Sequence, residues 1–155
     1  MPEENISAIA TPAGKGGVAI IRISGKNPLE LAAKMFTPTG KVQVADFEPY
    51  RMYPGKIDGG TFVDYGLCVY FKGPQSYTGE DIVEFQCHGG ESIARGILRQ
   101  ALRLGAKSAG RGEFTKRAFL NGKVDLTQAE SVMTLIEANG RLAVKTALSV
   151  REGAL

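Results

Sequence analysis

The sequence has few residues of the kinds that bind metals or form disulfides. It holds two cysteines, Cys68 and Cys87, and one histidine, His88, in 155 residues. Two cysteines cannot build a disulfide framework, and there is no CxxC pair to indicate a zinc site. Cys87 and His88 are neighbours in a segment typical of a β-strand, so their side chains point to opposite faces and cannot close on one ion. We therefore expect no metal site.

Long apolar runs are also missing. No stretch approaches the roughly 18 uninterrupted apolar residues that a membrane-spanning helix needs. The opening MPEENISAIA carries two acidic residues where a secretory signal peptide needs positive charge. With 43% hydrophobic and 23% charged residues, the composition is that of a globular protein with a core rather than a disordered chain. These features predict a cytoplasmic protein that does not enter a membrane.

A nucleotide-hydrolysing loop is absent as well. The segment TPAGKGG (residues 11–17) suggests a phosphate-binding loop, but a Walker loop needs the pattern GxxxxGK[ST] at the start of a helix. None of the five Gly-Lys pairs is followed by Ser or Thr. One histidine among many serines also makes no specific case for a Ser-His-Asp hydrolase. The sequence therefore argues against hydrolytic chemistry in this chain.

Positive charge is concentrated in the second half of the chain. Residues 1–88 carry 8 Lys and Arg against 10 Asp and Glu, whereas residues 89–155 carry 11 against 6, within a net charge of +3. Eight cations between residues 95 and 123 face one anion, Glu113, a density that attracts a polyanion or an anionic cofactor. The eight are Arg95, Arg99, Arg103, Lys107, Arg111, Lys116, Arg117 and Lys123. For the first three alone, a solvated helix face is an equal interpretation.

The pattern of strands and helices predicts an α+β fold. Strand-like segments with turn residues between them lie at residues 6–10, 18–24, 50–57, 61–71 and 81–90. Helix signals lie at residues 28–36, 91–104, 112–120 and from about 125. The first helix has an Asn27-Pro28 start with Glu30 as capping partner. The last is capped by Asp125 with Gln128 or by Thr127 with Glu130. We predict a mixed sheet with helices on one side, followed by an amphipathic helix.

Two charged residues stand in predicted strands. Arg22 lies in the apolar run VAIIRIS, where an unpaired cation is costly, so it must pair with a carboxylate or a ligand. Glu84 lies on the polar face of the alternating segment DIVEFQCH, opposite Val83, Phe85 and Cys87. We weigh two interpretations equally: a simple Arg22–Glu84 ion pair, or a recognition site held on rigid strands.

Other candidates are less specific. His88, before Gly89-Gly90, is equally a satisfied turn histidine or a site residue. Lys123 follows Asn121-Gly122 and has a stem long enough to reach a neighbouring surface. Four aromatic residues are candidates for an apolar wall beside a flat ring, although we favour core packing for each. They are Tyr77, Phe85, Phe114 and Phe119.

Three long motifs occur in order: ATPAGKGGVAIIRISG (residues 10–25), SYTGEDIVEFQCHGG (residues 76–90) and GEFTKRAFLNGKVDLTQAE (residues 112–130). Together they closely resemble the amino-terminal part of the MnmE/TrmE family of tRNA-modification GTPases, over essentially the whole chain. Arg111 stands where the family usually has proline, a difference that bears on the rigidity of that loop and leaves its neighbours unchanged.

The resemblance implies a three-part protein with a tetrahydrofolate-binding domain, a helical domain and a Ras-like GTPase domain inserted in the helical one. Residues 1–121 are then the folate-binding and dimerisation domain, and residues 122–155 open the helical domain. The GTPase domain, with its GTP, Mg²⁺ and K⁺, and the carboxy-terminal Cys motif are missing here. We therefore expect a piece of a GTP hydrolase, with no catalytic residues of its own.

By motif, Arg22, Glu84 and Lys123 match the family's positions for binding 5-formyltetrahydrofolate. A carboxylate accepts hydrogen bonds from a pterin's amino-pyrimidine edge and cations suit a glutamate tail, so we assign Glu84 to the pterin and the two cations to the tail.

The resemblance further implies a homodimer through this domain, tRNA as substrate, and MnmG as an FAD-dependent partner protein. The folate would supply the one-carbon unit for modifying the wobble uridine, in the 5-carboxymethylaminomethyluridine pathway. Two alternatives remain from the residues themselves. One is a stand-alone basic RNA-binding module, and the other is a purely structural dimerisation module.

Overall fold

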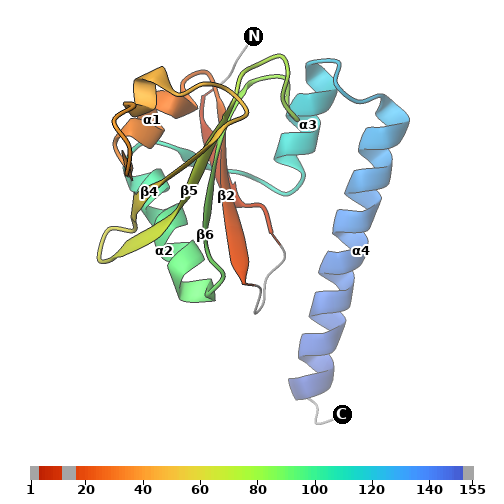
Figure 1. Cartoon of the computed structure of the whole chain (residues 1–155). Helices are drawn as coiled ribbons and strands as arrows, with labels where there is room; N and C mark the ends of the chain where they lie inside the picture. The colour runs from red at the N-terminus through yellow and green to blue at the C-terminus, as the bar shows by residue number, and fades with distance from the viewer. Residues whose placement is uncertain (1–3, 12–16, 152–155) are drawn as a thin grey trace.

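A computed structural model describes residues 4–11 and 17–151 of the chain, with side chains as far as residue 138. Within these ranges the chain forms one seven-stranded mixed sheet and four α-helices (Figure 1). The strand order is β3-β4-β5-β6-β2-β1-β7. Neighbouring strands are antiparallel except β1 and β7, which are parallel. The α+β prediction is confirmed.

The elements follow the predicted order closely. The strands are β1 (Ile6–Ile9), β2 (Val18–Gly25), β3 (Phe36–Pro38), β4 (Met52–Asp58), β5 (Val63–Phe71), β6 (Asp81–His88) and β7 (Lys107–Ser108). The helices are α1 (Pro28–Ala33), α2 (Glu91–Arg103), α3 (Glu113–Leu120) and α4 (Leu126–Arg151), with a 3-10 turn η1 (Val44–Asp46). The hairpin predicted around Asp58-Gly59-Gly60 is present as β4 and β5.

Strand β6 lies in the middle of the sheet, and its alternating side chains point to the two faces of the sheet in turn. Val83, Phe85 and Cys87 are almost fully buried in the core, which α1 and α2 cover. The ring of Phe85 stacks on that of Phe36 with 5.9 Å between centroids. Glu84 and Gln86 lie on the other face and are partly covered, whereas Ile82 on that face is buried. The predicted assignment of β6 residues to two faces is therefore confirmed.

Helix α3 departs from the prediction that all helices lie on one side. Figure 1 shows α1 and α2 on one side of the sheet, and α3 and α4 on the other. The buried residues of α3 are Thr115, Arg117 and Ala118, a set that is largely polar. Such a stripe has little to gain from an apolar core, so α3 packs against the sheet face that carries polar side chains.

The two predicted helix caps have different outcomes. At α4, Asp125 and Gln128 form a reciprocal capping box, each side chain accepting from the other's backbone N–H at 2.7 and 2.8 Å. At α1, the Asn27 side chain donates to Glu30 at 2.9 Å and makes no cap hydrogen bond to the helix backbone. The side-chain oxygen of Asn27 instead accepts a hydrogen bond from the side-chain N–H of Asn5 at 2.9 Å.

The far end of α4 answers one question that the sequence left open. The helix continues through Asn139-Gly140 to Arg151 without a break. Its predicted apolar stripe is the less exposed side as far as side chains are described, with Ala129 buried and Val132, Met133 and Ile136 partly buried.

Most of the glycine-rich turn predicted at residues 11–17 lies outside the described residues.

Both thiols are expected to resist alkylation in the folded protein. Burial raises the pKa of Cys68 to about 12, and burial, with a smaller contribution from Asp64, raises the pKa of Cys87 to about 11. Because the thiolate is the reactive form, almost none is present at pH 8. Incubation with iodoacetamide at pH 8, followed by mass spectrometry, should show no label on the native chain and two labels in urea. Labelling of the native chain at the rate seen in urea would contradict this.

Two kinds of feature are not found in the part of the chain that the structure describes. No helix there has the length and apolar character to cross a membrane. No cluster of three or more His, Cys, Asp or Glu side chains there is arranged to hold a metal ion. The charged residues on the partly covered sheet face are therefore the candidates for a site.

Candidate functional site

Arg22 and Glu84 are directly opposite each other on β2 and β6. The Nε atom of Arg22 donates to the Oε2 atom of Glu84 at 2.8 Å. Their side chains keep 24% and 13% of their exposure, so solvent still reaches both. The ion pair that the sequence offered as one interpretation is present. Because the pair is partly exposed, it is also accessible to a ligand, as the second interpretation, a recognition site, requires.

The pair uses only one edge of each group. Among the described residues, the two terminal nitrogens of Arg22 and the Oε1 atom of Glu84 have no hydrogen-bond partner. A guanidinium has five N–H donors and a carboxylate has about four acceptor positions, so most of the capacity of both groups is unused. The pair therefore presents donors and an acceptor side by side.

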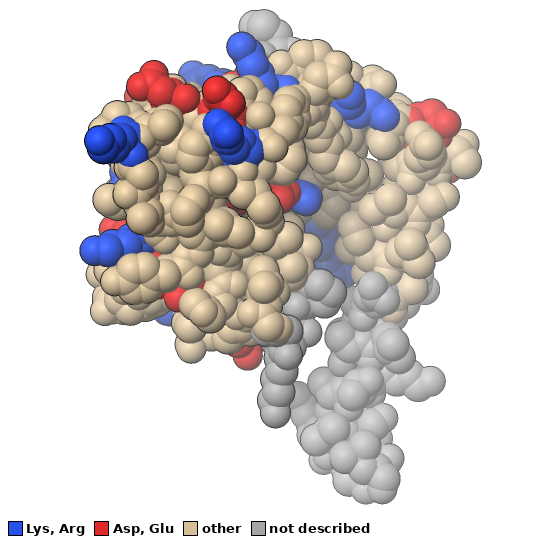
Figure 2. Space-filling model, in the orientation of Figure 1, with Lys and Arg blue, Asp and Glu red and all other residues tan. Residues whose placement is uncertain are grey.

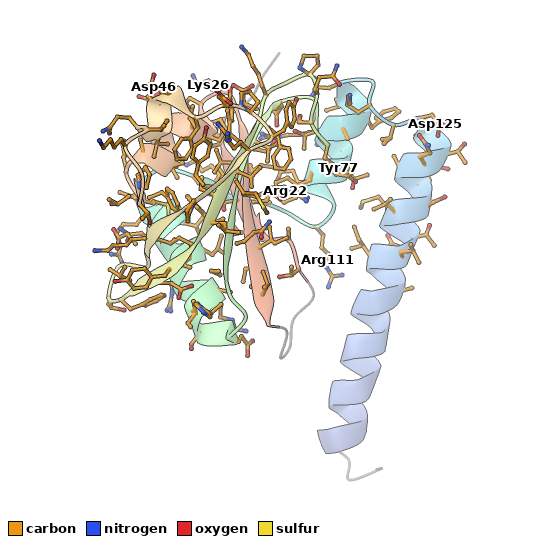
Figure 3. The ribbon with its side chains drawn as sticks, viewed as in Figure 1. Arg22, Lys26, Asp46, Tyr77, Arg111 and Asp125 are labelled. Carbon is orange, nitrogen blue, oxygen red and sulfur yellow. The ribbon has the colours of Figure 1, made fainter. Side chains whose placement is uncertain are left out.

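Two aromatic rings flank the guanidinium of Arg22. Its Cζ atom lies 5.5 Å from the ring centroid of Tyr77 and 5.3 Å from that of Phe114. Both distances are within the roughly 6 Å over which a cation is attracted to a ring face. Figure 3 shows Arg22 and Tyr77 close together between the sheet and α3. The Tyr77 hydroxyl is also 2.8 Å from that of Thr115, which links the loop of Tyr77 to α3.

The four aromatic candidates thus have different locations. Tyr77 and Phe114 lie beside Arg22, as a wall for a flat ring requires. Phe85 is fully buried in the core on the opposite face of the sheet, so it cannot form such a wall. Phe119 is 38% exposed and borders a hollow between α3 and α4.

A buried polar cluster, which the sequence did not reveal, holds this region together. Arg117 and Glu80, each 3% exposed, form an ion pair at 3.1 Å. Ser24 of β2 donates to Glu80 at 2.8 Å and lies 2.7 Å from the hydroxyl of Thr78. Arg117 also donates to the carbonyl of Glu4 at 2.8 Å. The cluster ties β2, the loop before β6 and α3 to one another.

The loop of residues 72–80, which carries Tyr77, is fixed at several further points. The hydroxyl of Tyr50 donates to the carbonyls of Lys72 and Gln75 at 3.1 and 2.7 Å. The N–H of Gly73 donates to Asp81 at 2.9 Å. Because these bonds fix the backbone of the loop, the ring of Tyr77 is held in place beside Arg22.

Lys123 reaches the same loop from its other side. The turn after α3 is closed by its backbone N–H, which donates to Ala118 at 2.8 Å, while its side chain is exposed. Gly79 has φ +82°, and a Cβ placed there would lie 2.8 Å from Asn121 Cβ and 3.3 Å from Lys123 Cγ. Glycine at position 79 therefore permits both the turn and the close approach of Lys123.

His88 is held by a carboxylate at the far end of β6. Its Nδ1 atom is 2.7 Å from Asp64, and its backbone N–H donates to the same carboxylate at 2.9 Å. Asp64 is 8% exposed, whereas the side chain of His88 is 66% exposed. This is the satisfied histidine that the sequence offered as one interpretation. Arg22 is opposite Glu84, four residues before His88 on β6.

Two hollows lie elsewhere on the described surface. One of about 500 Å³ lies between α3 and α4 and is bordered by Arg111, Phe119 and Met133 among others. Figure 2 shows this hollow between the body of the domain and α4, with charged atoms on its walls. A smaller one of about 210 Å³ lies beside His88. Neither is bordered by Arg22, Glu84 or Lys123.

Not all eight cations of the basic stretch are available on the surface. Seven are exposed, but Arg117 is buried in its ion pair with Glu80 and cannot meet a polyanion. Arg95 pairs with Glu91 of its own helix at 2.6 Å. The positive charge open to a partner is therefore smaller than the sequence indicates.

Comparison with known proteins places these features in a family. The family described as "GTP-binding protein TrmE N-terminus" matches residues 5–123, well over half of the chain. The chain belongs to this family. Arg22, Glu84 and Lys123 of this TrmE amino-terminal chain all lie within the matched residues.

Three similar proteins share one name, tRNA modification GTPase MnmE. A protein of Symbiobacterium thermophilum named tRNA modification GTPase MnmE is 46% identical over 157 residues, covering 100% of this chain and 34% of its own length. Proteins of the same name from Roseiflexus castenholzii and Thermus thermophilus are 46% and 45% identical, covering 100% and 99% of this chain and 32% and 35% of their own lengths. The TrmE amino-terminal chain thus spans about a third of these relatives.

Two sequence-based assignments stay predictions. One is the domain boundary between residues 1–121 and 122–155, where the turn between α3 and α4 lies. The other is the assignment of Arg22, Glu84 and Lys123 to folate binding. The structure brings Arg22 and Glu84 into contact, and it brings Lys123 to the loop that carries Tyr77.

Proposed function

We propose that this chain is the folate-binding part of a tRNA-modification GTPase, and that Arg22, Glu84 and Lys123 hold 5-formyltetrahydrofolate. The observation that carries the proposal is the Arg22–Glu84 pair, which is partly open to solvent and flanked by the rings of Tyr77 and Phe114. A reduced folate has a flat polar heterocycle, an aromatic linker and a carboxylate tail. A site for it needs hydrogen-bonding groups, flat apolar walls and a cation, which these residues supply.

The unused hydrogen-bonding capacity of the pair supports this fit. The terminal nitrogens of Arg22 and the Oε1 atom of Glu84 have no partner among the described residues. An ion pair that served only to stabilise the sheet would gain from a two-point contact, which Arg and carboxylate groups readily form. The single contact through Nε keeps the remaining edges for another molecule.

The wider role is what the resemblance to the family implies, and it is part of the proposal. The folate would supply a one-carbon unit for modification of the tRNA wobble uridine, together with the FAD-dependent partner MnmG. GTP hydrolysis, with its Mg²⁺ and K⁺, would belong to a part of a longer protein outside this chain. We propose that the chain forms a homodimer near the folate site and works in the cytoplasm.

Substitution of Glu84 by glutamine is expected to weaken binding of 5-formyltetrahydrofolate by about tenfold or more. The charged acceptor is lost while shape is kept, and hydrogen bonds to charged groups contribute about 1.5–3 kcal/mol. Isothermal titration calorimetry of the 155-residue chain measures the change. Glu48→Gln is the matched control, because Glu48 is 71% exposed and pairs with Arg51 on the surface. Equal affinity of wild type and Glu84→Gln would contradict the assignment.

A basic RNA-binding module is the second candidate, supported by the seven exposed cations of residues 95–123. Contacts to phosphates release counterions, so binding to tRNA would weaken steeply as salt rises. Titrating the chain with tRNA and with the folate at two salt concentrations separates the two functions. If the chain binds neither ligand but is dimeric in solution, the result would support the third candidate, a purely structural dimerisation module.

A further inference from the structure

Helix α2 carries a row of three exposed arginines, which we call the arginine row. Its members, Arg95, Arg99 and Arg103, are four residues apart on the helix. Four residues of an α-helix rise about 6 Å and turn about 40° beyond a full circle, so successive arginines point in neighbouring directions. The arginine row therefore places three guanidinium groups along about 12 Å of the helix surface.

The packing of α2 directs the arginine row away from the sheet. Ala94, Ile97 and Ala101 of the same helix are at most 3% exposed and lie in the core. Figure 1 shows α2 on the side of the sheet opposite to α3 and α4. Because its buried residues face the sheet, the exposed arginines face outward, on the side of the molecule that does not carry Glu84. The arginine row is thus a surface separate from the proposed folate site.

Negative charge is scarce around the arginine row. The sequence has no Asp or Glu from residue 92 to residue 112. In the part of the chain that the structure describes, Arg99 and Arg103 form no ion pair with a carboxylate. Arg95 pairs with Glu91, but both side chains are more than half exposed, at 66% and 59%, so another anion can replace this contact at little cost.

The last arginine of the row lies beside the turn between β4 and β5. A Cβ placed at Gly60 would lie 3.4 Å from Nη1 of Arg103, so the guanidinium is close to this turn. The carboxylate of Asp58 in the turn accepts from the N–H of Gly60 at 2.8 Å and from the side chain of Gln100 at 3.0 Å. Asp58 is therefore occupied by other donors and leaves the guanidinium of Arg103 to a different anion.

The arginine row is unfavourable for the helix itself. Like charges four residues apart repel each other and destabilise a helix, and the row contains two such pairs. Only Arg103, in the last turn, gains from the helix dipole. A helix face that serves solubility alone gains more from charges of both signs. The repulsion is relieved when an anion lies along the row, which favours a binding surface over the solvated helix face.

The surroundings favour a chain of phosphates over an acidic protein as that anion. The centre of a protein interface is usually apolar or aromatic, whereas the large exposed apolar side chains of the described chain all lie outside residues 91–118. Guanidinium groups bind phosphate oxygens through paired hydrogen bonds, which an ammonium group cannot reproduce. An RNA backbone presents repeated phosphates and requires no apolar contact.

We propose that the arginine row of α2 binds the phosphate backbone of the tRNA that the protein modifies. The inference rests on the proposed function for the identity of this RNA and does not depend on the folate site. With up to three phosphate contacts, the row positions the RNA without reading its sequence.

The salt dependence of tRNA binding tests the proposal. The 155-residue chain is titrated with a fluorescent, unmodified tRNA transcript at several salt concentrations, and the slope of log affinity against log salt is measured. Each phosphate contact contributes roughly 0.7–0.9 to this slope, so R95Q/R99Q/R103Q should reduce it by about 2–3. The same variant should bind at least about tenfold more weakly than wild type at about 0.1 M salt. Each single variant should reduce the slope by about 1.

A matched control removes three exposed cations from another place. Lys26, Lys34 and Lys41 are exposed around α1, and K26Q/K34Q/K41Q lowers the net charge by the same amount as the arginine variant. It should reduce the slope by less than about 1, because it removes general attraction and no phosphate contact. Equal loss of slope in the two triple variants, or no tRNA binding by the wild-type chain, would overturn the proposal.

Two further measurements separate the alternatives. Poly-L-glutamate stands for an acidic protein surface and should not displace tRNA at an equal concentration of charge; displacement would overturn the choice of RNA. Calorimetry with 5-formyltetrahydrofolate should give equal affinities for wild type and R95Q/R99Q/R103Q, with circular dichroism melts to confirm folding. A folded variant with weakened folate binding would contradict a surface separate from the folate site. Absence of folate binding by wild type would instead overturn the proposed function, while the salt slopes still decide the arginine row.

Discussion

Replacing Arg117 with alanine is expected to lower the free energy of unfolding by about 3–5 kcal/mol. The substitution leaves Glu80, 3% exposed, without the guanidinium that faces it at 3.1 Å. It also removes the donor to the carbonyls of Glu4 and Ser24, which are 2.8 and 3.3 Å away. Urea denaturation followed by circular dichroism measures the change, and it should appear as a lower midpoint with an unchanged slope.

A surface ion pair provides the comparison for Arg117. Arg51 and Glu48 are 3.2 Å apart, with side chains 64% and 71% exposed, so Arg51→Ala should cost less than about 1 kcal/mol. Arg117→Lys tests the geometry, because one ammonium cannot reproduce the spread of contacts that the guanidinium makes. A loss below about 1 kcal/mol for Arg117→Ala would show that the buried cluster does not hold the loop and α3 to the sheet.

Truncating Phe85 to alanine is expected to destabilise the chain by about 3–5 kcal/mol. The side chain is fully buried in the centre of β6 and stacks on Phe36 at 5.9 Å, so its removal leaves a cavity between the sheet and the helices. The same urea titration measures this loss.

Two variants bracket the result for Phe85. Phe85→Leu keeps most of the apolar volume and should cost clearly less than Phe85→Ala. Tyr65→Ala removes an aromatic ring that is 64% exposed and should change stability by less than about 1 kcal/mol. A similar loss for Tyr65→Ala and Phe85→Ala would mean that Phe85 is not part of the core.

Local patterns predicted the long elements well. The alternation of DIVEFQCH determined both the strand and its two faces, because one-sided burial fixes which residues point inward. Short elements escaped prediction. β7 has two residues, and its pairing with Ile6 and Ser7 depends on a strand about a hundred residues earlier in the chain. No local pattern carries that information.

The sequence predicted the pairing of Arg22 with Glu84 as one of two interpretations, and it did not predict the buried cluster beside that pair. The cost of burying charge required a partner for Arg22, and the pairing with Glu84 met that requirement. The buried pair of Arg117 and Glu80 was missed because Arg117 is one cation among eight in the sequence. A helical signal was present, since Arg117 follows Phe114 by three residues and precedes Ala118, and so falls on the inward side of α3.

The long final helix has a mechanical consequence. With 26 residues and a rise of 1.5 Å for each, α4 is about 39 Å long, and it starts just after the turn that carries Lys123. A rod of that length, pivoting at its first turn, moves its far end by about 0.7 Å for every degree of tilt. A tilt of about 7° at the turn that carries Lys123 would therefore displace Arg151 by about 5 Å, roughly the length of a side chain.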